Sequence, residues 1–324
     1  MRIHILALDE VFDTGLSTLL DTLNIANDLA GSVDALSTRF NVTVIGMRRR
    51  IRTSHGFIVP VVATSRSESP DVVLIPALGA KMPETLELAL KRKDVRDAGS
   101  LLRELAGGST LVGAACTGTF VLADTSLLEG RSATTSWWLA PLFRERYPGV
   151  RLEESRMVVS SSGFVTAGAA LAHIDLALWL IRRSSPTLAE LTARYLLIEP
   201  RSSQAVFAIP DHLSHADPLV QRFERWARCQ LGKSFSLGEA AIATGSSERT
   251  LSRRLQAVIG KSPLAYFQDL RVERAIHLLR TSSDNVDSIA AQVGYADGAT
   301  LRSLLRRKTG RPISALRIPP WGQP

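Results

Sequence analysis

Cysteine is scarce in this chain of 324 residues, which contains two, Cys116 and Cys229. Two cysteines make neither a disulfide framework nor the ligand set of a structural zinc site. We therefore expect no disulfide scaffold, no metal and no other cofactor. Cys229 falls in a helical pattern, and we expect it to be a small buried hydrophobe.

Long apolar runs are missing as well. No stretch of the sequence reaches the roughly 20 residues that span a bilayer. The opening residues MRIHILALDE carry no secretory cleavage pattern. These absences argue against a membrane partner and predict that the chain stays in the cytoplasm. Its length allows two domains, each with a core of its own.

The net charge of +8 is distributed unevenly. Residues 219–324 hold 17 Lys and Arg against 8 Asp and Glu, whereas residues 1–218 hold 22 against 23. The excess positive charge therefore lies in the last third of the chain, as binding to phosphate groups requires. The run Arg48–Arg52 is a local exception, and we interpret it as a solvated strand edge or loop rather than as a second nucleic-acid site.

The same third of the chain contains one helical pattern twice. In residues 236–260 and again in residues 286–310, a helix with a small, apolar face is followed by a glycine, Gly245 or Gly294, and then by a basic amphipathic helix. Equivalent positions lie 49 or 50 residues apart. Small residues let the two helices of a pair cross closely, and the glycine can adopt positive φ in the turn. The pattern predicts two helix-turn-helix units.

Residues 262–282 join the two units. Their apolar positions fit a buried connecting helix. Such a helix could hold two recognition helices on successive major-groove faces, roughly 34 Å apart along the duplex. A basic helical bundle that touches no DNA is the alternative, but the doubled motif and its flanking charge argue against it.

The two units and the connecting helix resemble the AraC-type family of bacterial transcription regulators. The resemblance implies double-stranded DNA as a partner, read by side chains that point outward from the recognition helices. Arginine can pair with guanine, whereas serine and threonine are less selective. The candidates for base contacts are Arg249, Thr250, Ser252 and Arg253 in the first unit and Thr300, Arg302 and Ser303 in the second. The candidates for phosphate contacts, which position without specifying, are Arg254, Arg306, Arg307 and Lys308.

The first two thirds of the chain alternate short apolar runs with helical segments. RIHILAL, NVTVIG, DVVLIP and TLVGAA have the composition of buried strands, and their alternation with helices is typical of a parallel sheet covered on both faces. We predict an α/β doubly wound parallel sheet of the flavodoxin-like kind, followed by an all-α domain. Ligands of such sheets gather at the carboxyl ends of the strands, where Gly79 belongs to a loop.

Cys116 stands where the strand TLVGAA runs directly into a helix. This is the geometry of a nucleophile elbow, in which Gly113 and Gly118 would relieve the crowding around the turn. Amide groups at the start of a helix lower the pKa of a thiol and suit a bound anion. The sequence thus predicts a thiol of lowered pKa beside an anion site.

This part of the chain resembles the PfpI-like branch of the glutamine-amidotransferase-like superfamily, with its class I fold. The likeness covers residues 1–185 and is carried by residues 116–148, 157–168 and 174–181. A domain of this kind followed by an AraC-type domain is the arrangement of GlxA-family regulators. The resemblance implies a homodimer, and RNA polymerase is a further candidate partner.

Catalytic members of that superfamily place a histidine beside the elbow cysteine. The corresponding position here is Ser136, and a neutral serine cannot take the thiol proton, which forfeits a rate factor of roughly 10² to 10⁴. We therefore predict that the chain is not an enzyme and has kept the pocket. His173 fits a structural histidine, and Asp21 fits either an acidic partner or a solvated helix residue. The remaining histidines, any of which could approach Cys116 in the fold, are His4, His55, His212, His215 and His277.

Prolines and short polar side chains after residue 200 indicate a domain junction. We divide the chain into a sensing domain of residues 1–200, a linker of residues 201–217 and a DNA-binding domain of residues 218–324. The predicted function is a transcription regulator whose first domain senses a small polar metabolite. The residues predicted to bind that metabolite are Gly79, Cys116, Thr117, Gly118, Ser136 and Trp137.

Two other functions stay open for the first domain. A cysteine-dependent hydrolase or amidase would need a base for Cys116. A redox sensor built on the same thiol would lack an adjacent resolving cysteine.

Overall fold

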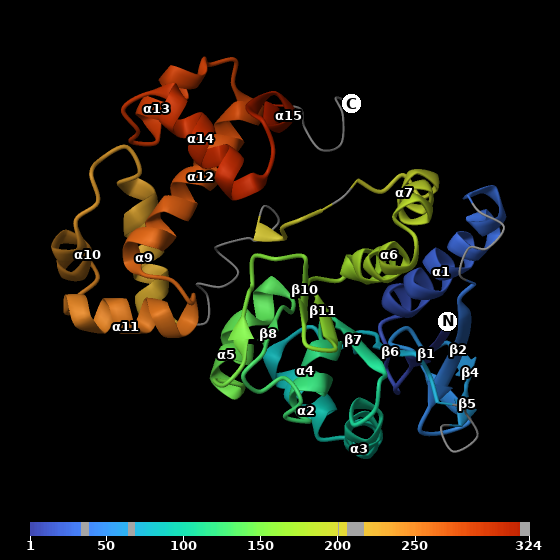
Figure 1. Cartoon of the computed structure of the whole chain (residues 1–324). Coiled ribbons are helices and arrows are strands. Elements are labelled where there is room, and N and C mark those ends of the chain that lie inside the picture. Colours follow the sequence, from blue (N-terminus) through green and yellow to red (C-terminus); the bar gives the residue numbers. More distant parts are fainter. Residues whose placement is uncertain (34–38, 64–68, 200, 206–216, 318–324) are drawn as a thin grey trace. The chain divides into compact units, whose positions relative to one another are not determined.

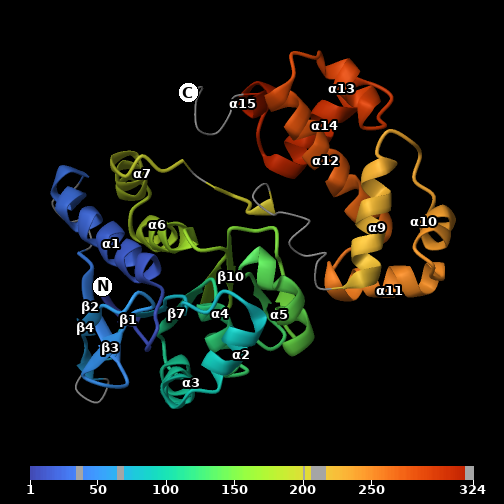
Figure 2. The same ribbon diagram turned by 180° about the vertical axis from the view of Figure 1, so that it is seen from behind.

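The described residues form two compact units. The computed structural model describes residues 1–33, 39–63, 69–199, 201–205 and 217–317. The first unit is Met1–Gln204 and the second is Ala205–Pro324. Figures 1 and 2 show the chain from two sides, coloured along the sequence. Along the part of the chain so described, no helix is both long and apolar enough to cross a membrane.

A seven-stranded sheet forms the centre of the first unit, in the order β10-β11-β7-β6-β1-β2-β5. Neighbouring strands are parallel except β10 and β11, which are antiparallel. The predicted doubly wound parallel sheet is therefore confirmed, with an antiparallel strand added at one edge. Its strands are β1 (Arg2–Leu6), β2 (Asn41–Gly46), β5 (Val62–Ala63), β6 (Val72–Ile75), β7 (Leu111–Ala115), β10 (Val158–Ser161) and β11 (Phe164–Ala167).

Helices cover both faces of this sheet (Figure 1). One core lies under α1, α6 and α7, and a second lies under α2, α3, α4 and α5. All of β6 is buried because its side chains alternate between these cores: Val73 belongs to the second and Leu74 to the first. The helices are α1 (Asp13–Val33), α2 (Pro83–Leu90), α3 (Lys93–Ala106), α4 (Gly118–Ala123), α5 (Ala140–Arg146), α6 (Ala172–Ser184) and α7 (Pro186–Tyr195).

Shorter elements lie outside the main sheet. A pair of antiparallel strands, β3 (Arg50–Arg52) and β4 (Ile58–Pro60), contains the last three residues of the basic run Arg48–Arg52. Arg50 and Arg52 are exposed while Ile51 between them is buried, so the expectation of a solvated strand is confirmed. The remaining short elements are β8 (Ser132–Ala133), β9 (Arg151–Leu152) and the 3₁₀ helix η2 (Trp137–Leu139).

The second unit is all helical and contains the two predicted helix-turn-helix pairs, α10 with α11 and α13 with α14. Gly245 and Gly294 both have positive φ, 65° and 77°, in the turns that separate the helices of each pair. Both predicted pairs are therefore confirmed, and so is the connecting helix α12. The helices are α9 (Pro218–Cys229), α10 (Leu237–Ala243), α11 (Glu248–Val258), α12 (Pro263–Thr281), α13 (Val286–Gln292), α14 (Gly298–Thr309) and α15 (Ile313–Arg317).

Short polar residues start each helix of the two pairs. The side chains of Ser236, Ser247, Asn285 and Asp297 each accept a hydrogen bond from a backbone amide three residues further on. Such caps satisfy amides that have no partner inside the helix. These local signals explain why the helix-turn-helix pairs begin where they do.

One prediction for the second unit is wrong. Cys229, expected to be buried, is exposed at the end of α9. The inward positions of that helix are taken by Val220, Phe223 and Ala227, and residue 229 lies off their face.

Candidate functional site

Cys116 occupies the sharp turn between β7 and α4, as the sequence predicts. Its φ is +56°, in the left-handed region that a non-glycine residue rarely adopts. The next turn of chain is equally tight, because a Cβ atom on Gly118 would lie 2.5 Å from the carbonyl oxygen of Ile75. The elbow therefore has a strained backbone at Cys116, and it requires a glycine at position 118 because no side chain fits there.

The thiol of Cys116 is enclosed. Its Sγ lies 3.3 Å from Oγ of Ser136, and Cys116 is only 4% exposed. Burial raises the pKa of the Cys116 thiol above its ordinary value, although the Ser136 hydroxyl, the Thr117 amide and the charge of Lys81 act in the opposite direction. The prediction of a lowered pKa was wrong, because desolvation outweighs the amides of a six-residue helix.

The other residues predicted to bind a ligand surround the elbow. The buried hydroxyl of Thr117 donates to the carbonyl of Leu78, and the next residue, Gly79, donates its amide to Glu10 at 2.7 Å. Ser136 is fully buried. The structure thus brings Cys116, Thr117 and Ser136 together.

The two tryptophans that follow Ser136 border this region. Trp137 is half-buried and its ring meets that of Trp138 edge to face, with centroids 5.4 Å apart. The indole nitrogen of Trp138 donates to the carbonyl of Lys81. Cys116 and Ser136 are thus buried, whereas both tryptophans are half-buried.

Histidines in the described part of the first unit are engaged elsewhere. Nε2 of His173 accepts from the Ala77 amide at 3.0 Å, and Nδ1 donates to the Ala170 carbonyl at 2.6 Å. Burial lowers the pKa of His173 to about 4, so its ring is neutral and structural, as expected. His55 bonds the carboxylate of Asp13.

The remaining predicted partners of the thiol divide into three cases. Asp21 is exposed on α1, which matches the solvated alternative. His4 lies in β1, and His277 lies in α12 of the second unit. His212 and His215 fall outside the described residues.

Residues 201–204 were predicted to belong to the linker, yet they bond to the first unit. Arg201 forms an ion pair with the buried carboxylate of Asp175. The amide of Met157 donates to the carbonyl of Ser202, and the amide of Gln204 donates to the carbonyl of Ser155 at 2.9 Å. We call residues 201–204 the strap.

The strap ends in a side chain that no sequence pattern singled out. Gln204 is 1% exposed, and its Nε2 donates to the carbonyls of Thr135 and Glu154, both at 2.8 Å. The hydroxyl of Thr135 in turn donates to the carbonyl of Cys116 at 2.7 Å. One residue therefore joins the elbow to the end of the strap. In the sequence Gln204 is simply one polar residue in a polar segment.

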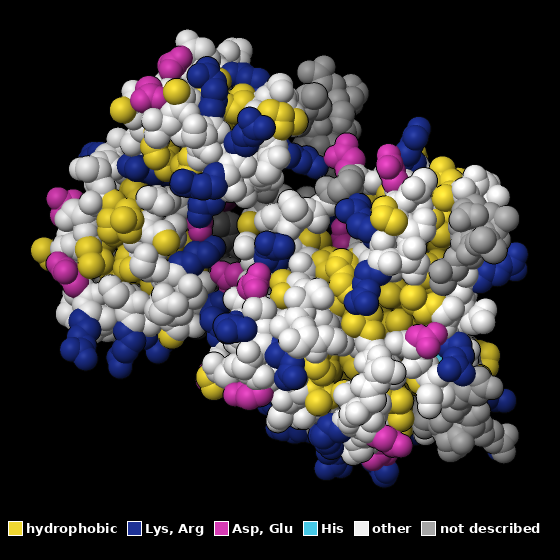
Figure 3. Space-filling model, in the orientation of Figure 1, with side chains coloured by type: hydrophobic (Ala, Val, Ile, Leu, Met, Phe, Trp, Pro, Cys, Tyr) yellow, Lys and Arg dark blue, Asp and Glu magenta, His cyan; other side chains and the backbone are white. Residues whose placement is uncertain are grey.

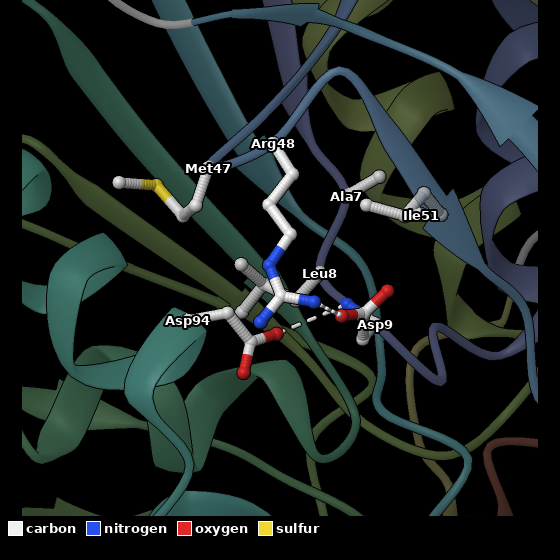
Figure 4. A pocket seen from close by; sticks show the side chains of 7 residues that line it. All are labelled: Ala7, Leu8, Asp9, Met47, Arg48, Ile51 and Asp94. Carbon is white, nitrogen blue, oxygen red and sulfur yellow. Dashed lines mark hydrogen bonds and ion pairs between the residues drawn. The ribbon is translucent and has the colours of Figure 1, made fainter.

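A shallow hollow lies away from the elbow, near the end of β1. Figure 4 shows the guanidinium of Arg48 directed at Asp9, 3.2 Å from Nη1 to Oδ2, while the amide of Asp9 donates to Asp94. Arg92 also bonds Asp94. Since these charged side chains already bond one another, the hollow leaves few charged groups available to bind a ligand. Among the described residues no cluster of three or more His, Cys, Asp or Glu could hold a metal. The residues drawn are Ala7, Leu8, Asp9, Met47, Arg48, Ile51 and Asp94.

The second helix of each helix-turn-helix pair presents its basic side chains to solvent. Lysine and arginine side chains are visible on the second unit in the space-filling view (Figure 3). Thr250 and Ser252 are half-buried, and the hydroxyls of Thr250 and Thr300 bond the capping residues Ser247 and Asp297. The exposed members of the predicted set are Arg249, Arg253, Arg254, Thr300, Arg302, Ser303, Arg306 and Arg307.

Two of the predicted phosphate contacts are paired within the second unit. Lys308 is half-buried and bonds Asp269 at 2.8 Å, and Arg254 is paired as well. It forms an ion pair with Asp217, whose side chain is 2% exposed and also caps α9 through the amides of Leu219 and Val220. Burial alone would raise the pKa of Asp217, but those two amides and the guanidinium lower it below its ordinary value. Arg254 is therefore tied to Asp217, the last residue of the predicted linker and the cap of α9.

Comparison with known proteins gives two family matches. Residues 1–183 match the DJ-1/PfpI family, and residues 240–318 match a helix-turn-helix domain family. The first match covers the sheet and the elbow, and the second covers both helix-turn-helix pairs.

Individual relatives match most of the chain or a part of it. The chain is 25% identical over 328 residues to the HTH-type transcriptional regulator GbdR of Pseudomonas aeruginosa, covering 99% of this chain and 86% of that protein. It is 24% identical over 229 residues to the HTH-type transcriptional regulator GlxA of Rhizobium meliloti, covering 69% and 70%. A putative transcriptional regulator from Vibrio parahaemolyticus superposes with a TM-score of 0.51 at 20% identity, covering 60% of this chain and 98% of that structure; this likeness shows the fold.

Proposed function

The chain belongs to the DJ-1/PfpI family and ends in an AraC-type helix-turn-helix domain, and from this we infer that it is a DNA-binding transcription regulator whose first unit senses a small polar metabolite. The observation that carries this function is the doubled helix-turn-helix unit behind a DJ-1/PfpI unit. GbdR, a named transcriptional regulator, is similar to almost the whole chain.

The proposed DNA surface is the outer side of α11 and α14. Arg249 and Arg253 on α11 and Arg302 on α14 are exposed and have the side chain that pairs best with guanine. Arg306 and Arg307 lie towards the end of α14 and suit phosphates. Thr250, Ser252, Thr300 and Ser303 complete the proposed base-contacting set.

Arg254 can contact a phosphate only in competition with Asp217. Because the ion pair is already formed within the unit, exchanging the carboxylate for a phosphate brings less net gain than a free arginine would. We propose that Arg254 orients α11 from the linker side, and that its share in phosphate binding is smaller than that of Arg306.

The proposed sensing site is the elbow around Cys116. A small polar metabolite would displace the packed side chains of Ser136 and Trp137 and take hydrogen bonds from the amides near Gly79 and Gly118. Since Cys116 and Ser136 are buried, binding there requires a change of conformation. A ligand shifts an equilibrium only when it binds the two states unequally, so the metabolite would have to bind the opened site more tightly than the packed one.

The strap provides a path by which such a change could leave the site. Thr135 bonds Cys116 on one side and Gln204 on the other. Any displacement of residues 134–136 therefore disturbs the anchor of the chain segment that leads to the second unit. We propose that release or tightening of Gln204 is the signal, acting within a homodimer that recruits or blocks RNA polymerase.

A cysteine-dependent hydrolase is the second candidate. It has the elbow in its favour, but burial raises the pKa of Cys116, and Ser136 occupies the position of the base. The described histidines of the first unit bond other groups or lie on other elements. We propose that the chain catalyses no reaction.

The proposed function is tested in two steps on the full chain. Selection of duplexes from a random pool should yield one sequence family, with binding that weakens steeply as salt rises. A thermal-shift screen of amino acids, amines and related metabolites should then give a ligand that changes the affinity for the selected duplex. Hydrolysis of an amide substrate, lost in Cys116→Ala, would favour the hydrolase instead.

A further inference from the structure

The two helix-turn-helix pairs have separate cores, and the boundary between the cores falls at one residue of α12. Phe267 and Leu270 belong to the first core, whereas Val272 and Ala275 belong to the second. Arg271 lies between them and is 9% exposed. A buried guanidinium thus stands where the two halves of the unit meet.

Arg271 contacts both halves. Its Nε donates to the carbonyl of Leu231 at 2.9 Å, and its Nη2 donates to the carbonyl of Lys233, both in the loop that follows α9 in the first half. The guanidinium carbon lies 5.2 Å from the ring centroid of Tyr295, in the turn between α13 and α14 of the second half. It also lies 4.8 Å from the ring centroid of Phe267. A planar guanidinium can stack on aromatic rings and donate in its own plane at the same time.

Gly294 lets the turn of the second half approach this arginine. A Cβ atom at that position would lie 2.3 Å from Nη2 of Arg271 and 2.6 Å from the carbonyl oxygen of Leu231. The glycine is therefore required for contact between the halves as well as for the positive φ of its turn.

Asp269, two residues before Arg271, ties α14 and the segment between α11 and α12 to α12 itself. One carboxylate oxygen lies 2.9 Å from Nζ of Lys261, just after α11. The other accepts from Nζ of Lys308, in the last turn of α14, at 2.8 Å. The Asp269 side chain is 18% exposed, so both ion pairs are partly shielded from solvent. We call Asp269 and Arg271 together the waist.

We propose that the waist fixes the separation and orientation of α11 relative to α14, and thereby determines which spacing between the two contacted blocks of a duplex the chain accepts. The inference rests on the proposed function, since it requires both helices to read DNA. One added base pair moves the second block about 3.4 Å along the axis and about 35° around it. A rigid waist cannot follow that movement, whereas a loosened waist can.

The test compares spacings on the full chain. A duplex selected from a random pool is measured against the same duplex with one base pair inserted between its two contacted blocks. The wild-type chain should bind the inserted duplex about tenfold more weakly or worse, as for one lost base contact. Arg271→Lys keeps the charge but loses the planar fork, and Asp269→Asn loses both ion pairs. Each should reduce the penalty to about threefold or less.

Arg274→Lys is the matched control, because Arg274 is exposed on the same helix; it should keep the wild-type penalty. Circular dichroism establishes that each variant is folded. Tyr295→Leu, which removes one aromatic face, repeats the comparison if Arg271→Lys does not fold. A wild-type chain indifferent to the insertion, or variants that weaken on both duplexes by the same factor, would overturn the role of the waist. A wild-type chain that selects no sequence would instead overturn the proposed function.

Discussion

The side chain of Gln204 fills the space beside Gly168 so closely that a Cβ atom on Gly168 would lie 2.5 Å from Gln204 Oε1. This contact seats the end of the strap in the first unit, next to the segment that touches Cys116. A position predicted to lie in the linker is thus part of the interior of the first unit.

Gln204→Ala should destabilise the first unit by about 1–3 kcal/mol, because it leaves the buried carbonyls of Thr135 and Glu154 without their donor. A metabolite found by thermal shift should still bind this variant, yet change its DNA affinity less than in the wild-type chain. Gln221→Ala, at a half-buried glutamine of α9, is the control. An unchanged DNA response in Gln204→Ala would remove the strap from the signalling path.

The two cysteines should differ in reactivity. Cys229 is exposed, whereas Cys116 is buried with a raised pKa. In the native chain at pH 8, iodoacetamide should therefore modify Cys229, and it should modify Cys116 only after denaturant is added. Peptide mass spectrometry after timed labelling reads out both sites in one sample. Rapid labelling of native Cys116 would instead favour the hydrolase or the redox sensor as the function of the first unit.

Stability at alkaline pH should follow from the same thiol. The pKa of Cys116 is raised in the folded chain. The contribution of this thiol to the free energy of unfolding is therefore fully present below the ordinary thiol pKa of about 8.5, and it is lost as the pH rises towards the folded pKa. The free energy of unfolding, measured with urea, should therefore decrease less steeply with pH in Cys116→Ala than in the wild-type chain above that pH. Equal slopes would mean that the folded thiol ionises normally.

His173 should make the first unit sensitive to acid. Its pKa is lowered to about 4, so the unfolded chain binds a proton below about pH 6.5 while the folded chain does not. Stability is therefore present above pH 6.5 and falls towards pH 4, by up to about 3 kcal/mol. His173→Gln should be less stable at pH 7, but its free energy of unfolding, measured with urea, should change less with pH. The exposed His277→Gln should retain the wild-type pH dependence.

Replacing two arginines of the proposed DNA surface should affect DNA binding in different ways. Arg253→Ala, at a proposed base contact, should cost about 1–3 kcal/mol on the selected duplex and much less on a scrambled one. Arg306→Ala, at a proposed phosphate contact, should weaken binding to both duplexes and reduce the salt slope by about one. Fluorescence anisotropy over a salt series measures both quantities. An equal small loss on every duplex for Arg253→Ala would reject base reading there.

Local patterns carried the prediction of the fold. Runs such as DVVLIP become buried strands because both faces of a parallel sheet are covered, and Gly245 and Gly294 mark turns that require positive φ. Those signals lie within a few residues of the structure that they specify. The doubled motif then identified the second unit without any knowledge of its packing.

Long-range packing determined what the sequence could not reveal. The direction of the Cys116 pKa depends on how completely the thiol is buried, and that is set by Ser136 and other residues distant in sequence. The same holds for three further contacts, whose partners are 37 or more positions apart in the sequence. No periodic pattern describes how the elements that carry these partners pack together. The residues are Gln204, Arg271 and the pair of Arg254 with Asp217.

The central claim is that two helix-turn-helix pairs of one chain read one duplex together. Selection of duplexes from a random pool by the full chain, followed by hydroxyl-radical footprinting, tests it most directly. The account predicts two protected blocks for each chain, about 10 base pairs apart on one face of the duplex, with Arg253→Ala weakening contact at one block and Arg302→Ala at the other. A single protected block, or no preferred sequence at any salt concentration, would contradict it.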